Sequence, residues 1–333
     1  MRAGTGWTAI FCRILASYGQ VVHTVAVLAL DQVIPFDLAT PIEVFTRTRL
    51  PDGREPYRVL ICGATPTVRA GAFTLQPPHG LDALAEADTI VLPGCADPAP
   101  VPEKVLDALR QAAARGARLA SICSGAFVLA ATGLLDGLRV TTHWRAAGVL
   151  AALHPAIDVD PGVLYVDNGQ FLTSAGAAAG LDLCLHLIRR DHGSAVAADA
   201  ARLSVMPLER EGGQAQFIVH DQPPAPRGSA LEPLLRWLQD NAARDLTLAE
   251  IANRAGTSPR TLNRRFREQT GTTPLRWLHL ERVRQAQHLL ETTDHTIDRI
   301  AGEVGFGSPT AFRDRFKRIV GTSPRGYRAA FQG

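Results

Sequence analysis

The first two thirds of the chain alternate short apolar runs with longer segments whose apolar residues recur every three or four positions. Uninterrupted apolar runs are typical of strands buried on both faces, and the longer periodic segments are typical of helices. The predicted strands are 24–30, 57–62, 89–92, 118–122, 163–166 and 171–173, and the predicted helices are 37–46, 102–115, 125–132, 145–153 and 177–190. This order predicts an α/β domain with a doubly wound, flavodoxin-like parallel sheet.

The last third predicts helices, and its pattern occurs twice. Residues 251–274 and 300–324 share an Ile-Ala start, a central glycine and a Gly-Thr-[Ser/Thr]-Pro end. One extra residue, Phe306 or Gly307, lies in the turn of the second copy, and the apolar positions match when it is allowed for. These positions are Leu262 and Phe266 in the first copy and Phe312 and Phe316 in the second. The repeat predicts an all-α domain with two helix-turn-helix motifs.

The turn of each copy has matching local chemistry. An apolar helix ends at Gly256 or at Gly305, and glycine permits the positive φ of a tight turn. A Ser-Pro pair follows at 258–259 and at 308–309. Serine is a preferred N-cap, and proline fits the first helical position because its missing N–H costs nothing there. The second helix of each motif is therefore predicted to begin at its Ser-Pro pair.

Each predicted second helix has one apolar face and one polar face. The polar faces offer forked donors for guanine, an amide for adenine and positive charge for phosphates. The candidate DNA-binding residues are Arg260, Asn263, Arg264 and Arg267 in the first helix, and Thr310, Arg313 and Lys317 in the second. Asp314 shares the second polar face and weakens its attraction for phosphates. We therefore expect the second helix to read fewer bases or mainly to position the protein.

A helix predicted at 274–290 joins the two motifs. At about 1.5 Å per residue it would span roughly 25 Å, a length suited to two successive major grooves. The alternative is a pair of ordinary amphipathic helices with solvated arginines, because charged outer faces are common on helices. Two copies with the same cap and turn chemistry favour DNA binding over this alternative.

Residues 231–327 resemble the DNA-binding domain of the AraC/XylS family of transcription regulators. The resemblance rests on the Leu-x-x-x-Phe core of the first motif, on Arg282 in the spacer helix and on the closing pattern at 316–328. It implies a sequence-specific regulator, expected to be an activator, that binds double-stranded promoter DNA with both helices on one face. The overall pattern is most similar to regulators of the AdpA type.

Charge and composition favour separate domains. Residues 231–333 carry 17 Lys and Arg against 11 Asp and Glu, whereas residues 1–230 carry 18 against 21. The basic excess therefore lies where nucleic acid is expected to bind. A Pro- and Gly-rich linker is expected at 221–230, after an α/β domain at 22–220. Residues 1–21 are expected to be a disordered extension or the product of a start codon assigned too early.

The expected compartment and cofactor use rest on sequence features that we do not find. It contains no stretch of about eighteen apolar residues, so no membrane partner is expected. The five cysteines form neither a Cys-x-x-Cys pair nor a His/Cys ligand spacing, so we expect no metal and no cofactor. Without a recognisable signal peptide, the expected compartment is the cytoplasm, with the protein at the nucleoid through DNA binding.

The predicted strand at 118–122 runs directly into Cys123 and a helix start made of small residues. This is the layout of a nucleophile elbow, in which a tight turn pushes the side chain out of the sheet. The helix N-terminus below would favour a thiolate at Cys123. Backbone N–H groups near Gly94 and Ser124 could form a pair that stabilises an anion.

Residues 22–193 resemble the PfpI-like, class I amidotransferase-like superfamily, and most closely its GlxA type of regulator, in which such a domain precedes an AraC-type domain. The segments 125–137, 141–144 and 173–182 carry this resemblance. It implies that Asp37 occupies the place of an acid beside the nucleophile. It also implies that the domain forms a homodimer.

Residues that turnover needs are missing from this pattern. The protease branch has a histidine directly after the nucleophile, where this chain has Ser124, and the downstream His-x-Glu pair of amidotransferases does not occur. The role of His143 stays open, because it could line the pocket as a neutral, hydrogen-bonded residue or act in it. We predict no enzyme activity and a pocket that senses a small-molecule effector or holds a dimer together. The alternatives are a hydrolase or hydratase that uses Cys123 and Asp37, and a redox-responsive regulator in which Cys123 is oxidised.

Overall fold

The computed structural model describes residues 22–97, 100–176, 178–209, 213–214 and 231–332. The chain divides into two compact units between residues 210 and 211, and each unit is described by itself. The expected extension at 1–21 and the expected linker at 221–230 lie outside the described residues, so both stay predictions. Within the ranges described, no helix is both long and apolar enough to cross a membrane.

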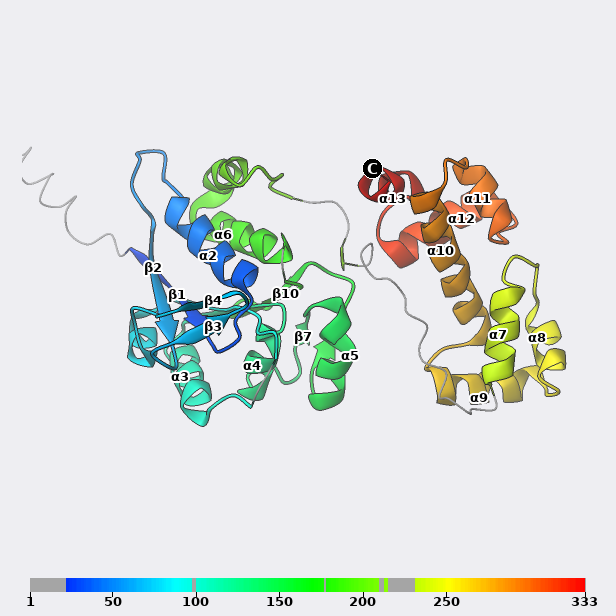
Figure 1. The fold of residues 1–333 in the computed structure, drawn as a ribbon, viewed down its shortest axis with the longest axis horizontal. Coiled ribbons are helices and arrows are strands. Elements are labelled where there is room, and N and C mark those ends of the chain that lie inside the picture. Colours follow the sequence, from blue (N-terminus) through cyan, green and yellow to red (C-terminus); the bar gives the residue numbers. More distant parts are fainter. Residues whose placement is uncertain (1–21, 98–99, 177, 210–212, 215–230, 333) are drawn as a thin grey trace, which may run out of the picture. The chain divides into compact units, whose positions relative to one another are not determined.

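The first unit is built on a six-stranded sheet with the order β2-β1-β5-β6-β10-β9 (Figure 1). Runs rich in valine, isoleucine and leucine form its central strands, and their side chains are buried on both faces. The strands are β1 (His23–Ala29), β2 (Tyr57–Gly63), β5 (Thr89–Leu92), β6 (Arg118–Ile122), β9 (Tyr165–Asp167) and β10 (Phe171–Ser174). Each lies at or within one or two residues of its predicted position.

The sheet is parallel except at one edge, where β9 runs antiparallel to β10. The expectation of a wholly parallel sheet is therefore wrong at this edge. The turn at 168–170 is too short for the crossover that a parallel pair requires. The Asp167 carboxylate accepts a hydrogen bond from the Gly169 N–H inside this turn, which holds the chain in a tight reversal.

Helices cover both faces of the sheet, as the doubly wound prediction requires. One face packs against α2 (Pro35–Arg47) and α6 (Ala178–Leu203), and the other against α3 (Glu103–Ala114) and α4 (Gly125–Ala131), whereas α5 (Trp144–Leu153) packs beside β8 (Asp158–Val159). Shorter elements escaped prediction because too few residues show a period. These are β3 (Val68–Ala70), β4 (Phe73–Leu75), β7 (Arg139–Val140), β8 (Asp158–Val159) and the 3-10 helix η1 (Leu81–Glu86).

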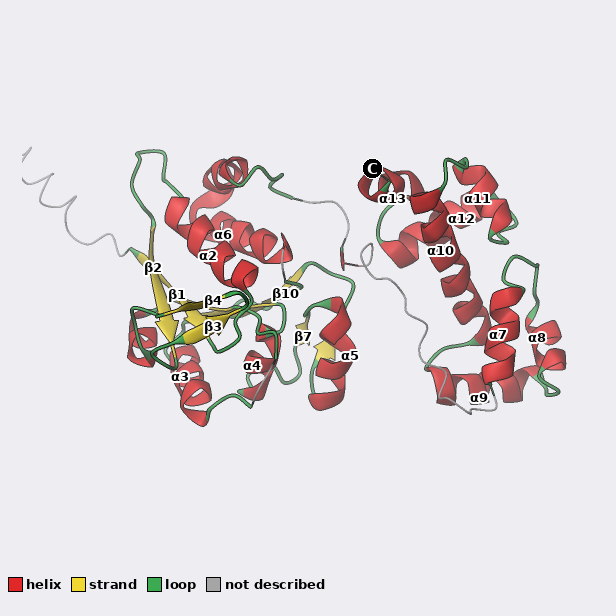
Figure 2. Ribbon diagram, in the orientation of Figure 1, coloured by secondary structure: helices red, strands yellow, loops and turns green. Residues whose placement is uncertain are grey.

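The described residues of the second unit form helices and connecting turns (Figure 2). The helices are α7 (Glu232–Asp240), α8 (Leu248–Arg254), α9 (Pro259–Thr270), α10 (Pro274–Thr292), α11 (Ile297–Glu303), α12 (Pro309–Val320) and α13 (Pro324–Phe331). The first apolar core surrounds Phe266, and the second surrounds Phe316. Because α10 contributes side chains to both cores, it is the spacer helix that the sequence predicts.

The predicted caps and turns of both helix-turn-helix motifs are confirmed. The hydroxyls of Ser258 and Ser308 each accept a hydrogen bond from the backbone N–H three residues later. Gly256 and Gly305 have φ angles of 62° and 85° in the two turns. A side chain is disfavoured at such angles, so the glycines fix where the first helix of each motif ends.

Candidate functional site

The first recognition helix, α9, separates a buried face from an exposed face. Leu262 and Phe266 are at most 1% exposed and belong to the first core. The predicted DNA-binding residues avoid this core, with the arginines exposed and the asparagine half-buried. They are Arg260, Arg264, Arg267 and Asn263. The helical spacing of these residues therefore presents three guanidinium groups to solvent.

The second recognition helix, α12, has the same division but a different charge pattern. Phe312 and Phe316 are fully buried in the second core. The predicted DNA-binding residues of this helix, Thr310, Arg313 and Lys317, are exposed. Asp314 is exposed beside them, and the Arg313 guanidinium forms an ion pair with Asp298 of α11. The second surface therefore offers DNA less positive charge than the first.

The exposed faces of α9 and α12 each include one exposed ion pair. Arg264 lies 2.9 Å from Glu268, one turn further along α9, and Arg313 pairs with Asp298 across the second motif. Pairs this exposed contribute little to stability because water screens them. A phosphate or a base edge can therefore replace either carboxylate at small cost.

The elbow predicted at Cys123 is confirmed. Cys123 joins β6 to α4 with a φ of 55°, a left-handed conformation that is unfavourable for a residue with a Cβ. Gly94 packs against it, and a Cβ on Gly94 would lie 3.0 Å from the Cys123 Cβ, 3.0 Å from the Ser124 Oγ and 2.6 Å from an oxygen of Asp37. The fold therefore brings together the four predicted residues Asp37, Gly94, Cys123 and Ser124.

The helix N-terminus, which favours a thiolate at Cys123, is opposed by two larger effects. Burial raises the pKa of the Cys123 thiol to about 12, and the charge of the Asp37 carboxylate adds to this increase. A hydrogen bond from the backbone N–H of Ser124, at the start of α4, lowers the pKa by less. Cys123 is therefore a neutral thiol at neutral pH, and a neutral thiol is a weak nucleophile.

Ser124 and His143 both hold backbone groups in place. The Ser124 hydroxyl accepts a hydrogen bond from the Cys95 N–H at 2.8 Å and donates one to the Cys95 carbonyl at 2.7 Å. The Nδ1 atom of His143 accepts a hydrogen bond from the Arg145 N–H at the start of α5, and its ring stacks on Trp144. Burial lowers the pKa of His143, so the ring is neutral and acts as a helix cap.

A cavity of about 680 Å³ opens beside the elbow. It lies at the carboxyl ends of β1, β2, β5 and β6, which is where open parallel sheets bind ligands. Its lining is mainly apolar and includes Leu30, Ser124, Phe127, Val128, Val149 and Leu153. Val149 and Leu153 are 55% and 64% exposed, so α5 presents large apolar side chains to the cavity.

The residues of α5 that line this cavity were not among the site residues predicted from the sequence. The helix buries Ala147 and Leu150, while Val149 and Leu153 lie on another side. A helix that is apolar on two sides needs an apolar contact on each side. The sequence of α5 already shows apolar residues on both sides, and this pattern could have indicated the cavity.

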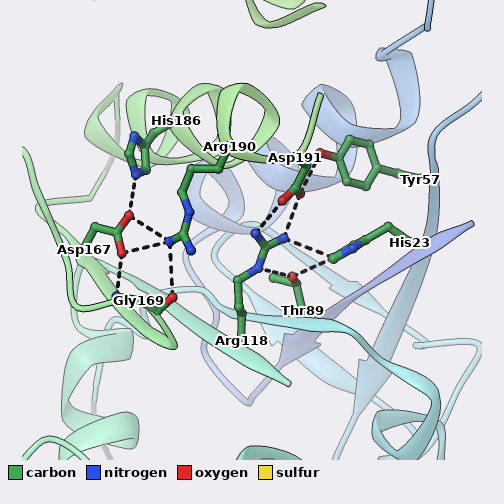
Figure 3. A network of polar contacts seen from close by, with 9 residues as sticks. All are labelled: His23, Tyr57, Thr89, Arg118, Asp167, Gly169, His186, Arg190 and Asp191. Carbon is green, nitrogen blue, oxygen red and sulfur yellow. Dashed lines mark hydrogen bonds and ion pairs between the residues drawn. The ribbon is translucent and has the colours of Figure 1, made fainter. Parts of the chain in front are cut away.

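A polar network at the opposite, amino end of the strands was also missed (Figure 3). Arg118 lies 2.6 Å from the Asp191 carboxylate, which also accepts a hydrogen bond from the Tyr57 hydroxyl at 2.9 Å. His23 and Thr89 complete the network, which ties α6 to the first residues of β1, β2, β5 and β6. We interpret it as structural, because ligand sites of parallel sheets lie at the carboxyl ends. Neither it nor another group of described His, Cys, Asp and Glu residues is arranged to hold a metal ion.

Comparison with known proteins accounts for both units. Residues 23–190 match the DJ-1/PfpI family, and residues 251–330 match a helix-turn-helix domain family. The chain is 34% identical over 227 residues to the HTH-type transcriptional regulator GlxA of Rhizobium meliloti, which covers 65% of this chain and 66% of that protein. The chain belongs to the AraC family of transcription regulators, in the group with an N-terminal DJ-1/PfpI domain.

Two further transcription regulators match, one over a longer stretch of sequence and one in structure. The HTH-type transcriptional regulator GbdR of Pseudomonas aeruginosa is 26% identical over 306 residues, which cover 91% of this chain and 83% of that protein. A crystal structure of an AraC-family transcriptional regulator from Pseudomonas putida matches with a TM-score of 0.50 and 19% identity. It covers 55% of this chain and 99% of that chain, and it supports the fold.

Proposed function

We propose that this AraC-family regulator reads a two-part DNA site by placing α9 and α12 in successive major grooves. The observation that carries the proposal is the pair of matched helices, each with a buried aromatic face and an exposed reading face, on one spacer. The spacer α10 has 19 residues and is therefore about 28 Å long, close to one turn of B-DNA at about 34 Å. The basic excess of the second unit supplies attraction to phosphates.

Gel-shift assays with the full chain test this proposal. The probes are fragments of its own promoter region, and random-sequence duplexes of the same length are the control. We expect selective binding that weakens as salt rises, because each phosphate contact releases counterions. Equal affinity for promoter fragments and random duplexes would contradict the proposal.

We also propose that the first unit is a sensor, which binds a small and mainly apolar effector in the cavity beside Cys123. The cavity volume of about 680 Å³ lies within the range of small-molecule sites. Its lining combines apolar side chains with a few polar ones, among them Asp31, Asp97 and Arg145. An effector changes DNA affinity only if it binds two arrangements of the protein with unequal affinity.

A matched pair of substitutions on α5 tests the cavity as the effector site. The thermal unfolding of the full chain is measured with a panel of uncharged, apolar metabolites. Val149→Arg places a charge in the cavity and is expected to abolish any stabilisation by ligand. Ala151→Arg, on an exposed part of the same helix, is the control and should keep it. Equal stabilisation of both variants would place the ligand elsewhere.

We further propose that the elbow takes part in binding and not in turnover. In support, Cys123 is a neutral thiol, and the side chains of Ser124 and His143 hold backbone groups. Both alternatives, a Cys123- and Asp37-dependent hydrolase or hydratase and a redox-responsive regulator, require a reactive thiol. Brief treatment with iodoacetamide at neutral pH, followed by mass spectrometry, should leave Cys123 unmodified in the folded chain. Rapid modification would favour one of the alternatives.

Homodimerisation and transcription activation complete the proposal, and the family resemblance supports both. Analytical ultracentrifugation of the full chain should give the mass of a dimer. A reporter gene behind the regulated promoter should be expressed more strongly when the protein is present. The mass of a monomer would contradict the proposed homodimer. A weaker reporter signal would contradict the proposed activation.

A further inference from the structure

The turn of the second helix-turn-helix motif is one residue longer than that of the first. Its Phe306 N–H donates to the Ala301 carbonyl as the Thr257 N–H donates to the Ala252 carbonyl, so Phe306 matches Thr257 and the added residue is Gly307. Phe306 packs against the second core, with its ring centroid 5.3 Å from that of Phe312. It also stacks with His279 of α10 at 6.1 Å, and the Arg282 guanidinium lies 5.8 Å from the centre of its ring. Phe306 therefore fills the space between the second motif and the spacer helix.

Gly305 brings the same turn against the first motif. A Cβ on Gly305 would lie 2.6 Å from the carbonyl oxygen of Ala243 and 2.8 Å from that of Ala242, just after α7. At the matching glycine of the first motif, Gly256, a Cβ would have no atom of the described chain within 4 Å. The turn of the second motif is thus in close backbone contact with the segment between α7 and α8, whose Ala242 belongs to the core of the first motif. This contact explains why a glycine is required there.

Arg282 of α10 completes this contact. It is 6% exposed, and its Nε donates a hydrogen bond to the Ala242 carbonyl at 2.8 Å. Its Nη2 donates a second hydrogen bond to the Arg244 carbonyl at 2.7 Å. Burial lowers the pKa of Arg282, but a guanidinium keeps its charge, and the carbonyls replace part of its lost hydration. Because loss of such partners leaves a buried charge unpaired, the arrangement resists distortion.

We propose that Arg282, Gly305 and Phe306 form a strut that sets the two recognition helices for one spacing of two DNA half-sites. The inference rests on the proposed reading of a two-part site. A spacer helix can bend, whereas a second connection between the motifs restricts their relative rotation. One added base pair moves a half-site by about 3.4 Å and turns it by about 34°. Two helices held rigidly distinguish such sites, and two loosely joined helices do not.

The test uses the full chain and an operator selected by the unaltered protein from random duplexes. Affinity is measured for this operator, for a version with one base pair inserted between the half-sites, and for a version with the second half-site scrambled. Gly305→Ala is compared with Gly256→Ala, because both replace a glycine of positive φ and they differ in the backbone contact. Phe306→Leu and Arg282→Lys alter the strut by smaller changes.

The unaltered protein and Gly256→Ala should prefer the selected operator over the inserted version by roughly tenfold or more, because both helices bind together. In the strut variants this preference should fall to about threefold or less, through a loss of affinity for the selected operator. Their affinity for the scrambled version, which the first motif binds by itself, should stay unchanged.

A strut variant that keeps the full spacing preference would overturn the proposal. Equal losses on all three duplexes would also overturn it, since they indicate general destabilisation. If the unaltered protein selects an operator but binds the version with the inserted base pair equally well, the proposed role of the strut is refuted and the proposed function stands. If the unaltered protein selects no operator, both the role of the strut and the proposed function are refuted.

Discussion

The two helix-turn-helix motifs differ most at the positions predicted to face DNA. These residues are Arg260, Arg264 and Arg267 in α9, and Arg313, Asp314 and Lys317 in α12. In the first motif the ion pair of Arg264 lies within the recognition helix, whereas in the second Arg313 is held by α11 through Asp298. We therefore propose that the first face reads bases and that the second contacts DNA with a weaker and more constrained set of charges.

The two cores differ in the opposite sense. In the second core Phe312, Phe316 and Tyr327 pack edge to face, with ring centroids 5.5 and 5.6 Å apart. In the first core the Phe266 and Trp277 rings are 6.5 Å apart. Edge-to-face contacts add to the stability that burial provides, so the second motif has the denser aromatic core. We infer that a duplicated scaffold has specialised, with the first motif reading bases and the second positioning the protein.

The largest expected effect is the loss of stability when the central phenylalanine of either core is truncated, and it tests whether the two cores unfold separately. Phe316→Ala and Phe266→Ala each remove a fully buried ring and should cost about 3–5 kcal/mol of stability. Hydrogen exchange of the full chain, followed by mass spectrometry, should show lost protection mainly in α11–α13 for Phe316→Ala and in α8–α9 for Phe266→Ala. Equal loss across both motifs in either variant would mean one cooperative core in place of two.

These cores were predictable because the residues that form each one recur at helical spacing within a short segment. The caps at Ser258 and Ser308 were predictable for the same reason, since a helix start depends on neighbouring residues. The strut was not predictable, because Arg282 meets the Ala242 carbonyl through the tertiary fold. The sequence indicated an extra residue at Phe306 or Gly307 but gave no sign of the contacts that Phe306 makes.

The elbow shows the same limit within a single site. The turn at Cys123 follows from its position between a strand and a helix, and it was predicted correctly. Its protonation was not predictable, because the sequence displays the helix N-terminus but neither burial nor the distance to Asp37. In this site the desolvation and the carboxylate charge outweigh the hydrogen bond from the helix start.

The next expected effect tests base reading by the first motif. Arg260→Ala should cost about 1–3 kcal/mol of binding free energy and relax base preference at one position, because an exposed guanidinium is lost from a base edge. Affinities for the selected operator and its single-base variants measure both effects. Arg313→Ala is the control in the second motif and should weaken binding to all of these duplexes evenly. Unchanged affinity in Arg260→Ala would mean that the reading face is placed wrongly.

A smaller effect is expected for Lys317 of α12. Lys317→Ala should lower affinity to a similar degree on all sequences and reduce the slope of log affinity against log salt by about one, because one phosphate contact is lost. Titrations of the full chain at several salt concentrations measure this slope. A change in base preference without a change in slope would assign Lys317 to base reading and make the two motifs more alike than we infer.

The smallest expected effect concerns the carboxylate that holds Arg313. Asp298→Asn should free the guanidinium for phosphate and raise DNA affinity by at most about fivefold, because exposed ion pairs are weak. Glu268→Gln is the matched change in the first motif, where it frees Arg264. If Asp298→Asn instead lowers affinity and alters base preference, then Asp298 orients Arg313 toward a base. The second motif would then read sequence too, and its difference from the first would be one of geometry more than of charge.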